Sequence, residues 1–529
     1  MADSLIRPLV TDKPRRRWRW WIAAVASVVV ATVAFAAGTM ADSIVEHRLR
    51  PATIQLLEQR FDSDVELASL DVRVFPTLII RADGLVLRHR ERKDIPPLIT
   101  AQSFTIESTL PELWARRVNR IRIEGLRITI PPRRREDMPG LPEQNESTGE
   151  TSDALIRELV ADNGVFTVMA RRAGKPPREF QLTHLRFENL QFGKSTPFEA
   201  EVSNPVPAGV IHTVGRFGPW NGEEPSLTAL GGGFRFNADL ASIDGIGGQL
   251  QAEGSYEGRL ERLDARGHAK SDAFRLSTGG ADFPLVVDYK ATVDGTSGDT
   301  LLDSVEADLG QSHISASGAI VREEQTKGRR ITLDTRARHG RIEDFIRLTT
   351  RVKTSPMVGA VDVTARLDIP PGKGEVIDRM TLAGKFALDA AKFTSKAIQD
   401  RIDELSRRGQ GRPSDERVDD VASDMRGAFE LAGARMTVRT LTFQVEGAQV
   451  RLAGAYGVKS ERLDFHGELR LQATVSQTQT GWRSLVLKVF DPLFRRKGAG
   501  TVLPITVTGT RAQPKFGVEV KKAILRTKN

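Results

Sequence analysis

The clearest indication of the fold is the stretch Leu463-Asp-Phe-His-Gly-Glu-Leu-Arg-Leu-Gln-Ala-Thr-Val475. An apolar residue or glycine occupies every odd-numbered position, and a polar or charged residue occupies every even-numbered one. A period of two is that of a β-strand with one apolar face and one face in water. The stretch therefore predicts a long strand whose apolar face must be covered by something.

The same alternation recurs at 361–369 and at 121–130, where its phase slips at Gly125 as at a bulge or tight bend. The chain has 529 residues, which is too many for one compact core, and 46 glycines that can supply turns. Apolar residues make up 40% and charged residues 27%, an ordinary globular balance. These features predict a mainly β protein with several domains or one repetitive body.

A weak internal repeat supports a repetitive body. Gly254-Ser-Tyr256 is followed by Leu263-Asp264 and Gly267, and Gly454-Ala-Tyr456 by Leu463-Asp464 and Gly467, at an offset of 200 residues. Gly318 opens a looser third version. Repeated hairpins that cannot bury their apolar faces alone form a long sheet, which can close as a barrel, stack as a sandwich or curl into a trough. Periodicity leaves these three alternatives open.

Residues 20–41 carry no charge and as a helix would be roughly 33 Å long, enough to span a bilayer core. Six basic residues precede this segment, against two acidic ones, so the N-terminus is predicted to stay cytoplasmic and the rest to be translocated. Trp18, Trp20 and Trp21 are predicted to contact the headgroup region. The alternative is a signal peptide cleaved near Ala34-Phe35-Ala36, but the apolar run is longer than such peptides need.

Three further segments are not strand-like. Residues 42–60 predict a short helical stalk interrupted at Pro51, and 131–153 are proline-rich and charged, which predicts an exposed linker. Residues 395–407 predict a helix, either capping the end of the sheet or serving a function of its own.

The stretch 482–494 predicts an amphipathic helix, restarted or kinked at Asp491-Pro492. Three basic residues follow it, so it either lies on a membrane or packs on the protein's own core. Its apolar stripe, the second set of candidate membrane contacts, comprises Trp482, Leu485, Val486, Val489, Phe490, Leu493 and Phe494.

Sequence signals of catalysis are missing. There is no cysteine, the eight histidines show no metal-ligand spacing, and no phosphate-binding loop, dinucleotide fingerprint or nucleophile elbow is present. The surplus of nine positive charges is scattered along the chain without a nucleic-acid motif, and attraction to anionic lipid is its more natural use. We therefore expect no enzyme, no cofactor, no metal and no nucleic-acid partner; a strand-borne hydrolase site is the remaining catalytic alternative.

Two stretches after the predicted anchor resemble the N-terminal module of AsmA-like proteins: Val74-Phe-Pro-Thr-Leu-Ile-Ile-Arg-Ala-Asp-Gly84-Leu-Val-Leu and Leu110-Pro-Glu-Leu-Trp-Ala-Arg-Arg-Val-Asn-Arg-Ile-Arg-Ile-Glu-Gly125-Leu-Arg-Ile-Thr-Ile130. The C-terminal part is similar to the end region of the same family. The residues that carry this likeness are Leu441-Thr-Phe-Gln-Val-Glu-Gly447, Val450-Arg-Leu-Ala-Gly454-Ala-Tyr456, Gly481-Trp-Arg-Ser484, Phe490-Asp-Pro492, Leu503-Pro-Ile-Thr-Val-Thr-Gly509-Thr and Pro514-Lys-Phe516.

The resemblance implies a protein anchored in the bacterial inner membrane by a single span, with an elongated, curled β-sheet in the periplasm. It also implies an apolar groove that binds phospholipids and contributes to their transport between inner and outer membrane and to outer-membrane integrity. Partner proteins in the periplasm or outer membrane are expected as well. The alternative is a non-enzymatic assembly or scaffold factor whose β core is fully self-buried.

The expected organisation has seven parts: a basic cytoplasmic N-terminus at 1–19, a transmembrane helix at 20–41, a stalk helix and N-terminal β module at 42–132, a polar linker at 133–153, a central β-groove body at 154–394, a helical insertion and loop at 395–425, and a C-terminal β module with the amphipathic helix at 426–529. The candidate lipid-binding residues are Leu463, Phe465, Leu469, Leu471 and Val475.

Overall fold

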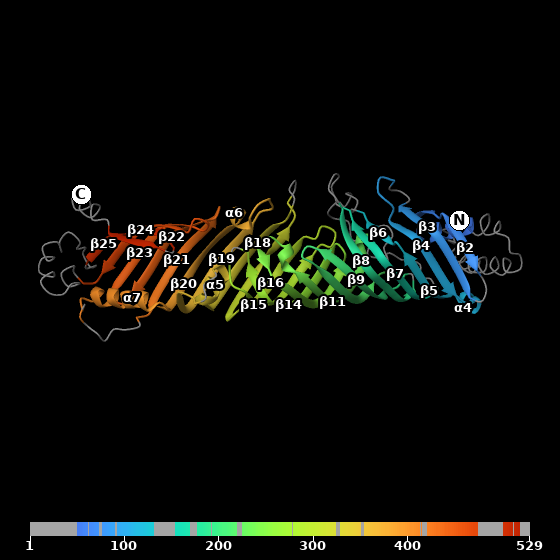
Figure 1. Cartoon of the computed structure of the whole chain (residues 1–529). Helices are drawn as coiled ribbons and strands as arrows, with labels where there is room; N and C mark the ends of the chain where they lie inside the picture. The colour runs from blue at the N-terminus through green and yellow to red at the C-terminus, as the bar shows by residue number, and fades with distance from the viewer. Residues whose placement is uncertain are drawn as a thin grey trace, which may run out of the picture. The chain divides into compact units, whose positions relative to one another are not determined.

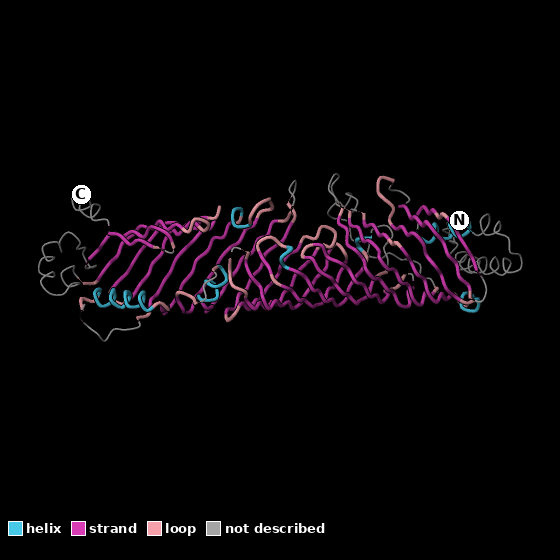
Figure 2. The backbone as a smooth tube through the Cα atoms, viewed as in Figure 1, coloured by secondary structure: helices cyan, strands magenta, loops and turns pink. Residues whose placement is uncertain are grey.

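The computed structural model describes residues 50–61, 63–73, 77–89, 93–131, 154–169, 177–191, 193–219, 225–277, 279–323, 328–350, 354–412, 414, 421–473, 501–511 and 513–518. Within these residues the chain forms 26 β-strands and a few short helices, which confirms the mainly β prediction (Figure 2). By its internal contacts the chain divides into two compact units. Unit 1 comprises 1–204, 211–234 and 257–261, and unit 2 comprises 205–210, 235–256 and 262–529.

The first described element of unit 1 is helix α3 (Arg50–Phe61), which packs on the first strands. The stalk helix is predicted over 42–60 with an interruption at Pro51, and residues 42–49 lie outside the described residues. The elements that follow are β1 (Ser63–Glu66), β2 (Ser69–Arg73), β3 (Leu78–His89), β4 (Ile99–Ser108), α4 (Leu110–Trp114), β5 (Arg117–Glu124), β6 (Arg127–Ile130), β7 (Leu155–Val168), β8 (Arg178–Gln191) and β9 (Thr196–Pro205).

Strands β5 and β6 are one strand broken by a bend. Both pair with β4 on one side and, in parallel, with β7 on the other. Gly125 lies between them with a φ of 61°, and a Cβ there would come within 2.5 Å of Gln102 Cγ. The left-handed conformation and the lack of space both require glycine. The predicted slip of phase at this residue is confirmed.

The predicted linker at 133–153 lies outside the described residues, but the strands on either side of it share one sheet. Residues Arg117 to Glu124 of β5 align with Leu155 to Asp162 of β7 in parallel register. A parallel pair needs a long connection, which this segment supplies. Unit 1 continues past this segment to Asn204.

Four strands are divided between the units at the boundaries given above: β9 at Pro205, β10 (Ala208–Phe217), β11 (Ala229–Asp239) and β13 (Gln249–Arg259). The short helix η2 (Pro225–Leu227) belongs to unit 1. The elements of unit 2 are η3 (Leu240–Ser242), β12 (Ile246–Gly247), β14 (Arg262–Leu276), β15 (Phe283–Val293), β16 (Thr300–Leu309), β17 (Ser312–Val321), β18 (Arg330–Arg341), α5 (Ile342–Thr349), β19 (Met357–Ile369), α6 (Val376–Arg379), β20 (Thr381–Phe393), α7 (Lys396–Gly409), β21 (Ser423–Ala432), β22 (Arg435–Val445), β23 (Ala448–Gly457), β24 (Arg462–Leu471), β25 (Thr501–Thr510) and β26 (Pro514–Val518).

From β14 to β26 each strand pairs antiparallel with the next strand in the sequence. Figure 1 shows β18 to β25 lying side by side in chain order. Two glycines of the internal repeat lie where strands approach too closely for a side chain: a Cβ on Gly454 or Gly467 would come within 2.1 Å of Asp464 O or 1.8 Å of Arg451 O. The prediction of successive hairpins is confirmed for this part of the chain.

The helix predicted at 395–407 is α7. Among the described residues no helix is long and apolar enough to cross a membrane. The predicted membrane span at 20–41 and the predicted amphipathic helix at 482–494 both lie outside the described residues.

Candidate functional site

The apolar face of unit 2 is built from rows of side chains that cross the strands. Because neighbouring strands are in register and side chains alternate between faces, residues paired across strands share one face. Row A comprises Leu333, Leu367, Leu382, Leu431, Met436, Tyr456 and Leu463. Row B comprises Thr335, Ala365, Gly384, Phe429, Val438, Gly454, Phe465, Val507 and Phe516.

Two more rows complete this face. Row C comprises Ala337, Val363, Phe386, Gly427, Leu441, Leu452, Gly467 and Ile505. Row D comprises Val361, Leu388, Met425, Phe443, Val450, Leu469 and Leu503. The four rows form a nearly continuous apolar surface over at least seven strands.

Row D is covered by two helices. Ile402 and Leu405 of α7 pack against the cluster of Phe443, Val445, Ala448 and Leu471. In Figure 2 the cyan helix α7 runs across the ends of the C-terminal strands.

Helix α5 covers row D farther along, where Ile342 and Phe345 pack against Val361, Leu388 and Ala391. Val361 and Leu388 are each only 1% exposed. The two helices thus bury one margin of the apolar face.

Both helices are fixed by buried polar contacts. In α7, Ser406 is fully buried and donates to Glu446 O at 2.8 Å, and Asp403 accepts from Val421 N at 2.9 Å. In α5, Asp344 accepts from Ser312 Oγ at 2.8 Å and from Gln311 N at 2.9 Å. Buried polar groups that lose such partners cost stability, so these bonds define where each helix sits.

Rows A to C are less covered than row D. Only a few of their side chains are buried, among them Leu431 at 5% and Val438 at 8% exposure. Leu367, Leu382, Phe386, Phe429, Leu452, Leu463 and Phe465 all remain partly exposed. A second sheet packed on these rows would exclude water from them, as protein cores do. The face is therefore partly accessible in its middle rows and closed at row D.

Glycines within the rows make room for aromatic rings. A Cβ on Gly384 would come within 2.9 Å of the Phe429 ring, and one on Gly427 within 2.7 Å of the Phe386 ring. Each ring therefore lies over the glycine of a neighbouring strand. The rings of Phe386 and Phe429 are 6.4 Å apart between centroids.

Two tyrosines also lie on this face. Burial raises the pKa of Tyr289, whose ring covers Gly267 on the paired strand. Burial is likewise the main cause that raises the pKa of Tyr456 in row A. Both phenols stay neutral at physiological pH, so they add no charge to the apolar surface.

The candidate lipid-binding residues do not share one environment. Leu463 and Phe465 lie in rows A and B and are partly exposed. Leu469 packs against the cluster under α7, and Leu471 is a buried member of that cluster at 6% exposure. Val475 lies outside the described residues.

The candidate membrane contacts also lie outside the described residues: Trp18, Trp20, Trp21, Trp482, Leu485, Val486, Val489, Phe490, Leu493 and Phe494.

Sequence reasoning missed several residues of the accessible rows. Phe386 and Phe429 alternate with polar neighbours in their strands, a signal that was present. Phe386 and Phe429 share one face of the sheet with Phe465 because of the register between strands. This register depends on bulges, such as those after Ala428 and after Val438, and alternation within a strand does not predict where bulges lie.

The opposite, polar face carries histidines that lie beside carboxylates. His268 Nδ1 lies 3.0 Å from Asp288 Oδ1, and His313 Nδ1 lies 2.7 Å from Asp308 Oδ1. The hydrogen bond that the His313 ring donates to Asp308 is the main cause that raises the pKa of His313. Within the described part of the chain no group of three or more metal-ligating side chains occurs.

Comparisons of this chain with models of protein families, with curated proteins and with solved structures find no match.

Proposed function

We propose that the chain is an AsmA-like lipid-handling protein of the bacterial envelope, and that rows A to C of unit 2 bind the acyl chains of phospholipids. The observation that carries this proposal is the partial exposure of large apolar side chains in rows that continue across many strands. Monomeric proteins rarely leave a contiguous apolar surface accessible without a ligand or partner for it.

The binding chemistry is hydrophobic burial. Each methylene group removed from water contributes about 0.8 kcal/mol, so an acyl chain of a dozen methylenes gains roughly 10 kcal/mol on a dry surface. Because the rows present similar apolar side chains from strand to strand, a bound chain meets a similar surface along them. Binding of this kind needs no catalytic residue and no cofactor, and it permits sliding.

The location belongs to the same proposal. The apolar run at 20–41 acts as a single inner-membrane span with the N-terminus in the cytoplasm, and the β units lie in the periplasm. There the protein contributes to lipid transport between inner and outer membrane, with partner proteins, and so to outer-membrane integrity. The curled shape of the sheet and its groove are part of this proposal and come from the resemblance to the AsmA-like family.

Lipid content tests the binding step. The full-length protein is purified as wild type, as Phe465→Asp and Leu367→Asp on the apolar rows, and as His466→Asp on the polar face of the same strand as Phe465. Lipids that remain bound are extracted and measured by mass spectrometry, and circular dichroism checks the fold. We expect phospholipid in wild type and His466→Asp, and a severalfold loss in the two apolar-row variants.

A folded wild type that carries no lipid would contradict the proposal. It would favour the alternative of an envelope scaffold or assembly factor.

A further inference from the structure

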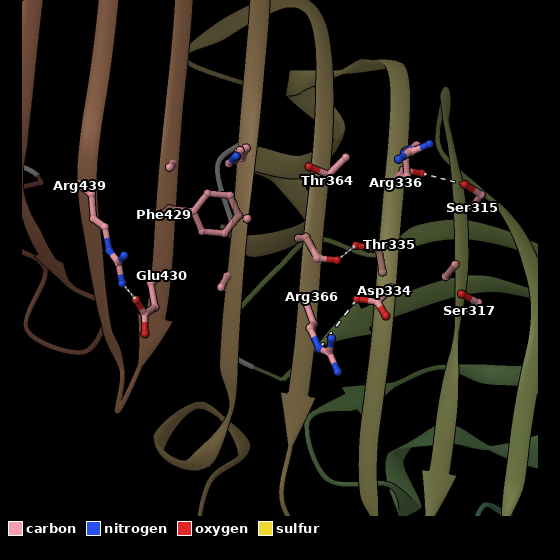
Figure 3. A pocket seen from close by; sticks show the side chains of 16 residues that line it. Ser315, Ser317, Asp334, Thr335, Arg336, Thr364, Arg366, Phe429, Glu430 and Arg439 are labelled. Atoms are coloured by element: carbon pink, nitrogen blue, oxygen red, sulfur yellow. Dashed lines mark hydrogen bonds and ion pairs between the residues drawn. The ribbon is translucent and has the colours of Figure 1, made fainter.

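A cavity of about 790 Å³ lies in unit 2 across strands β17 to β22 (Figure 3). Most of its lining residues alternate with those of rows A to C and so belong to the polar face. Ser315, Arg336, Thr364, Lys385 and Ala428 follow one another in register across five strands. Ser317, Asp334, Arg366, Ala383 and Glu430 form the adjacent register row. Thr335, Ala365, Gly384 and Phe429 of row B lie between these two rows and also line the cavity.

Two of the cations that line this cavity form ion pairs with its carboxylates. Arg366 Nε lies 3.9 Å from Asp334 Oδ1, and Arg439 Nη2 lies 2.7 Å from Glu430 Oε2. These pairs use both carboxylates of the lining.

Among the described residues, neither Arg336 nor Lys385 forms an ion pair. They flank Thr364 in one register row, so their Cα atoms are about 10 Å apart. The cavity has a net positive charge and two separated cations that can donate to a ligand.

Small residues leave the floor open between these long side chains. Ser315, Ser317, Ala383 and Ala428 project little, and Thr364 adds a hydroxyl between the two unpaired cations. Ser315 Oγ donates to Arg336 O, so it fixes the neighbouring backbone (Figure 3).

Arg439 is placed over the cavity by a bulge. Phe429 pairs with Val438 and Ala428 with Thr440, which leaves Arg439 as the extra residue. Bulges redirect side chains in this way and recur beside functional sites.

We propose that this cavity binds a phosphorylated molecule of the size of a sugar phosphate or a lipid headgroup. Guanidinium, ammonium and hydroxyl donors together match phosphate oxygens. A volume of about 790 Å³ is typical of sites for small organic ligands. The proposal does not depend on lipid binding by the apolar rows, because Arg336, Thr364 and Lys385 alternate with the residues of those rows.

The test uses the full-length protein in detergent micelles. Pyrophosphate is titrated by calorimetry, and flotation with vesicles containing phosphatidylglycerol is compared with vesicles of phosphatidylcholine alone. The variant is the double substitution Arg336→Gln with Lys385→Gln. The control is the double substitution Lys270→Gln with Lys290→Gln, which removes two exposed cations from the polar face outside the cavity.

We expect saturable pyrophosphate binding or selective flotation with wild type and control, weakened at least tenfold in the cavity variant. Loss of pyrophosphate binding alone identifies a soluble phosphate ester as the ligand, and loss of flotation alone identifies a lipid headgroup. No saturable binding of either probe by wild type would overturn the proposal. Equal binding by the cavity variant and the control would overturn it too.

Discussion

Phe465 and Leu471 lie on the same strand, β24, but their side chains differ in how deeply they are buried. Phe465 lies in row B and is partly exposed, whereas Leu471 is buried at 6% exposure beneath α7. A carboxylate at position 465 can turn toward water, but one at 471 would be buried without a partner. The same substitution should therefore affect binding at one position and folding at the other.

We expect Leu471→Asp to lower the free energy of unfolding by about 3–5 kcal/mol, the range of large core substitutions. Phe465→Asp should cost about 1–2 kcal/mol, because less apolar surface is withdrawn from water there. Urea unfolding followed by circular dichroism measures both values. Equal losses at the two positions would mean that row B is as buried as the core under α7.

At the scale of elements, the helix α7 is a fixed cover for row D and not a movable lid. Its buried Asp403 accepts from Gln399 Nε2 at 2.8 Å and from Val421 N at 2.9 Å, and its buried Ser406 reaches the loop before β23. These bonds join the helix to the strand that follows it and to a hairpin farther along the chain. A helix held at both places should not open without loss of stability.

Asp403→Ala tests this view of α7. The substitution leaves Val421 N without its acceptor and removes one of the two acceptors of Gln399 Nε2, which should cost about 1–3 kcal/mol of unfolding free energy. Amide hydrogen exchange over 396–409 should accelerate accordingly. Asp400→Ala, an exposed position of the same helix, is the control and should change neither quantity. Unchanged exchange in Asp403→Ala would show that the apolar contacts of Ile402 and Leu405 hold the helix without the polar ones.

An ion-pair network connects three strands of unit 1. Glu158 on β7 accepts from Arg120 Nε of β5 at 2.6 Å and from Arg186 Nε of β8 at 3.0 Å. The hydrogen bond from Arg120 is the largest cause that lowers the pKa of Glu158 below its ordinary value of 4.5, with the charges of Arg120 and Arg186 acting in the same direction and burial opposing them.

Because the pKa of Glu158 is lower in the folded chain, its contribution to stability is complete above pH 4.5 and is lost as the pH falls through the folded value. We expect Glu158→Gln to lose less stability than wild type between pH 7 and pH 3 in chemical unfolding. The exposed Glu253→Gln serves as the control and should follow wild type. A variant whose stability falls as steeply as that of wild type would contradict the role of this network.

At the scale of the whole molecule, alternation predicted which strands form and which face of each is apolar. The stretch at 463–471 is β24 and that at 361–369 lies in β19, each with the expected face turned to the apolar side. The bend at Gly125 was predictable because the alternation changes phase within the few residues around it. Local patterns of this kind are fixed by backbone geometry, which a single sequence reveals.

Features that depend on distant residues were not predictable. The parallel pairing of β5 with β7 joins segments on both sides of the polar stretch at 133–153, and no local pattern indicates this pairing. Bulges such as the one after Leu388 decide which residues share a row. The cavity on the polar face arises from register across five or more strands, and its residues carry no motif in the sequence.

We propose that phospholipid binds to the apolar rows of unit 2. Photocrosslinking in cells is the most direct test of this binding. A benzophenone amino acid replaces Phe465 on the apolar face in one full-length variant and His466 on the polar face in another. After irradiation, mass spectrometry of the purified protein detects any lipid adduct. We expect a phospholipid adduct at position 465 and little or none at position 466. Absence of an adduct at 465, or equal adducts at both positions, would contradict the proposal.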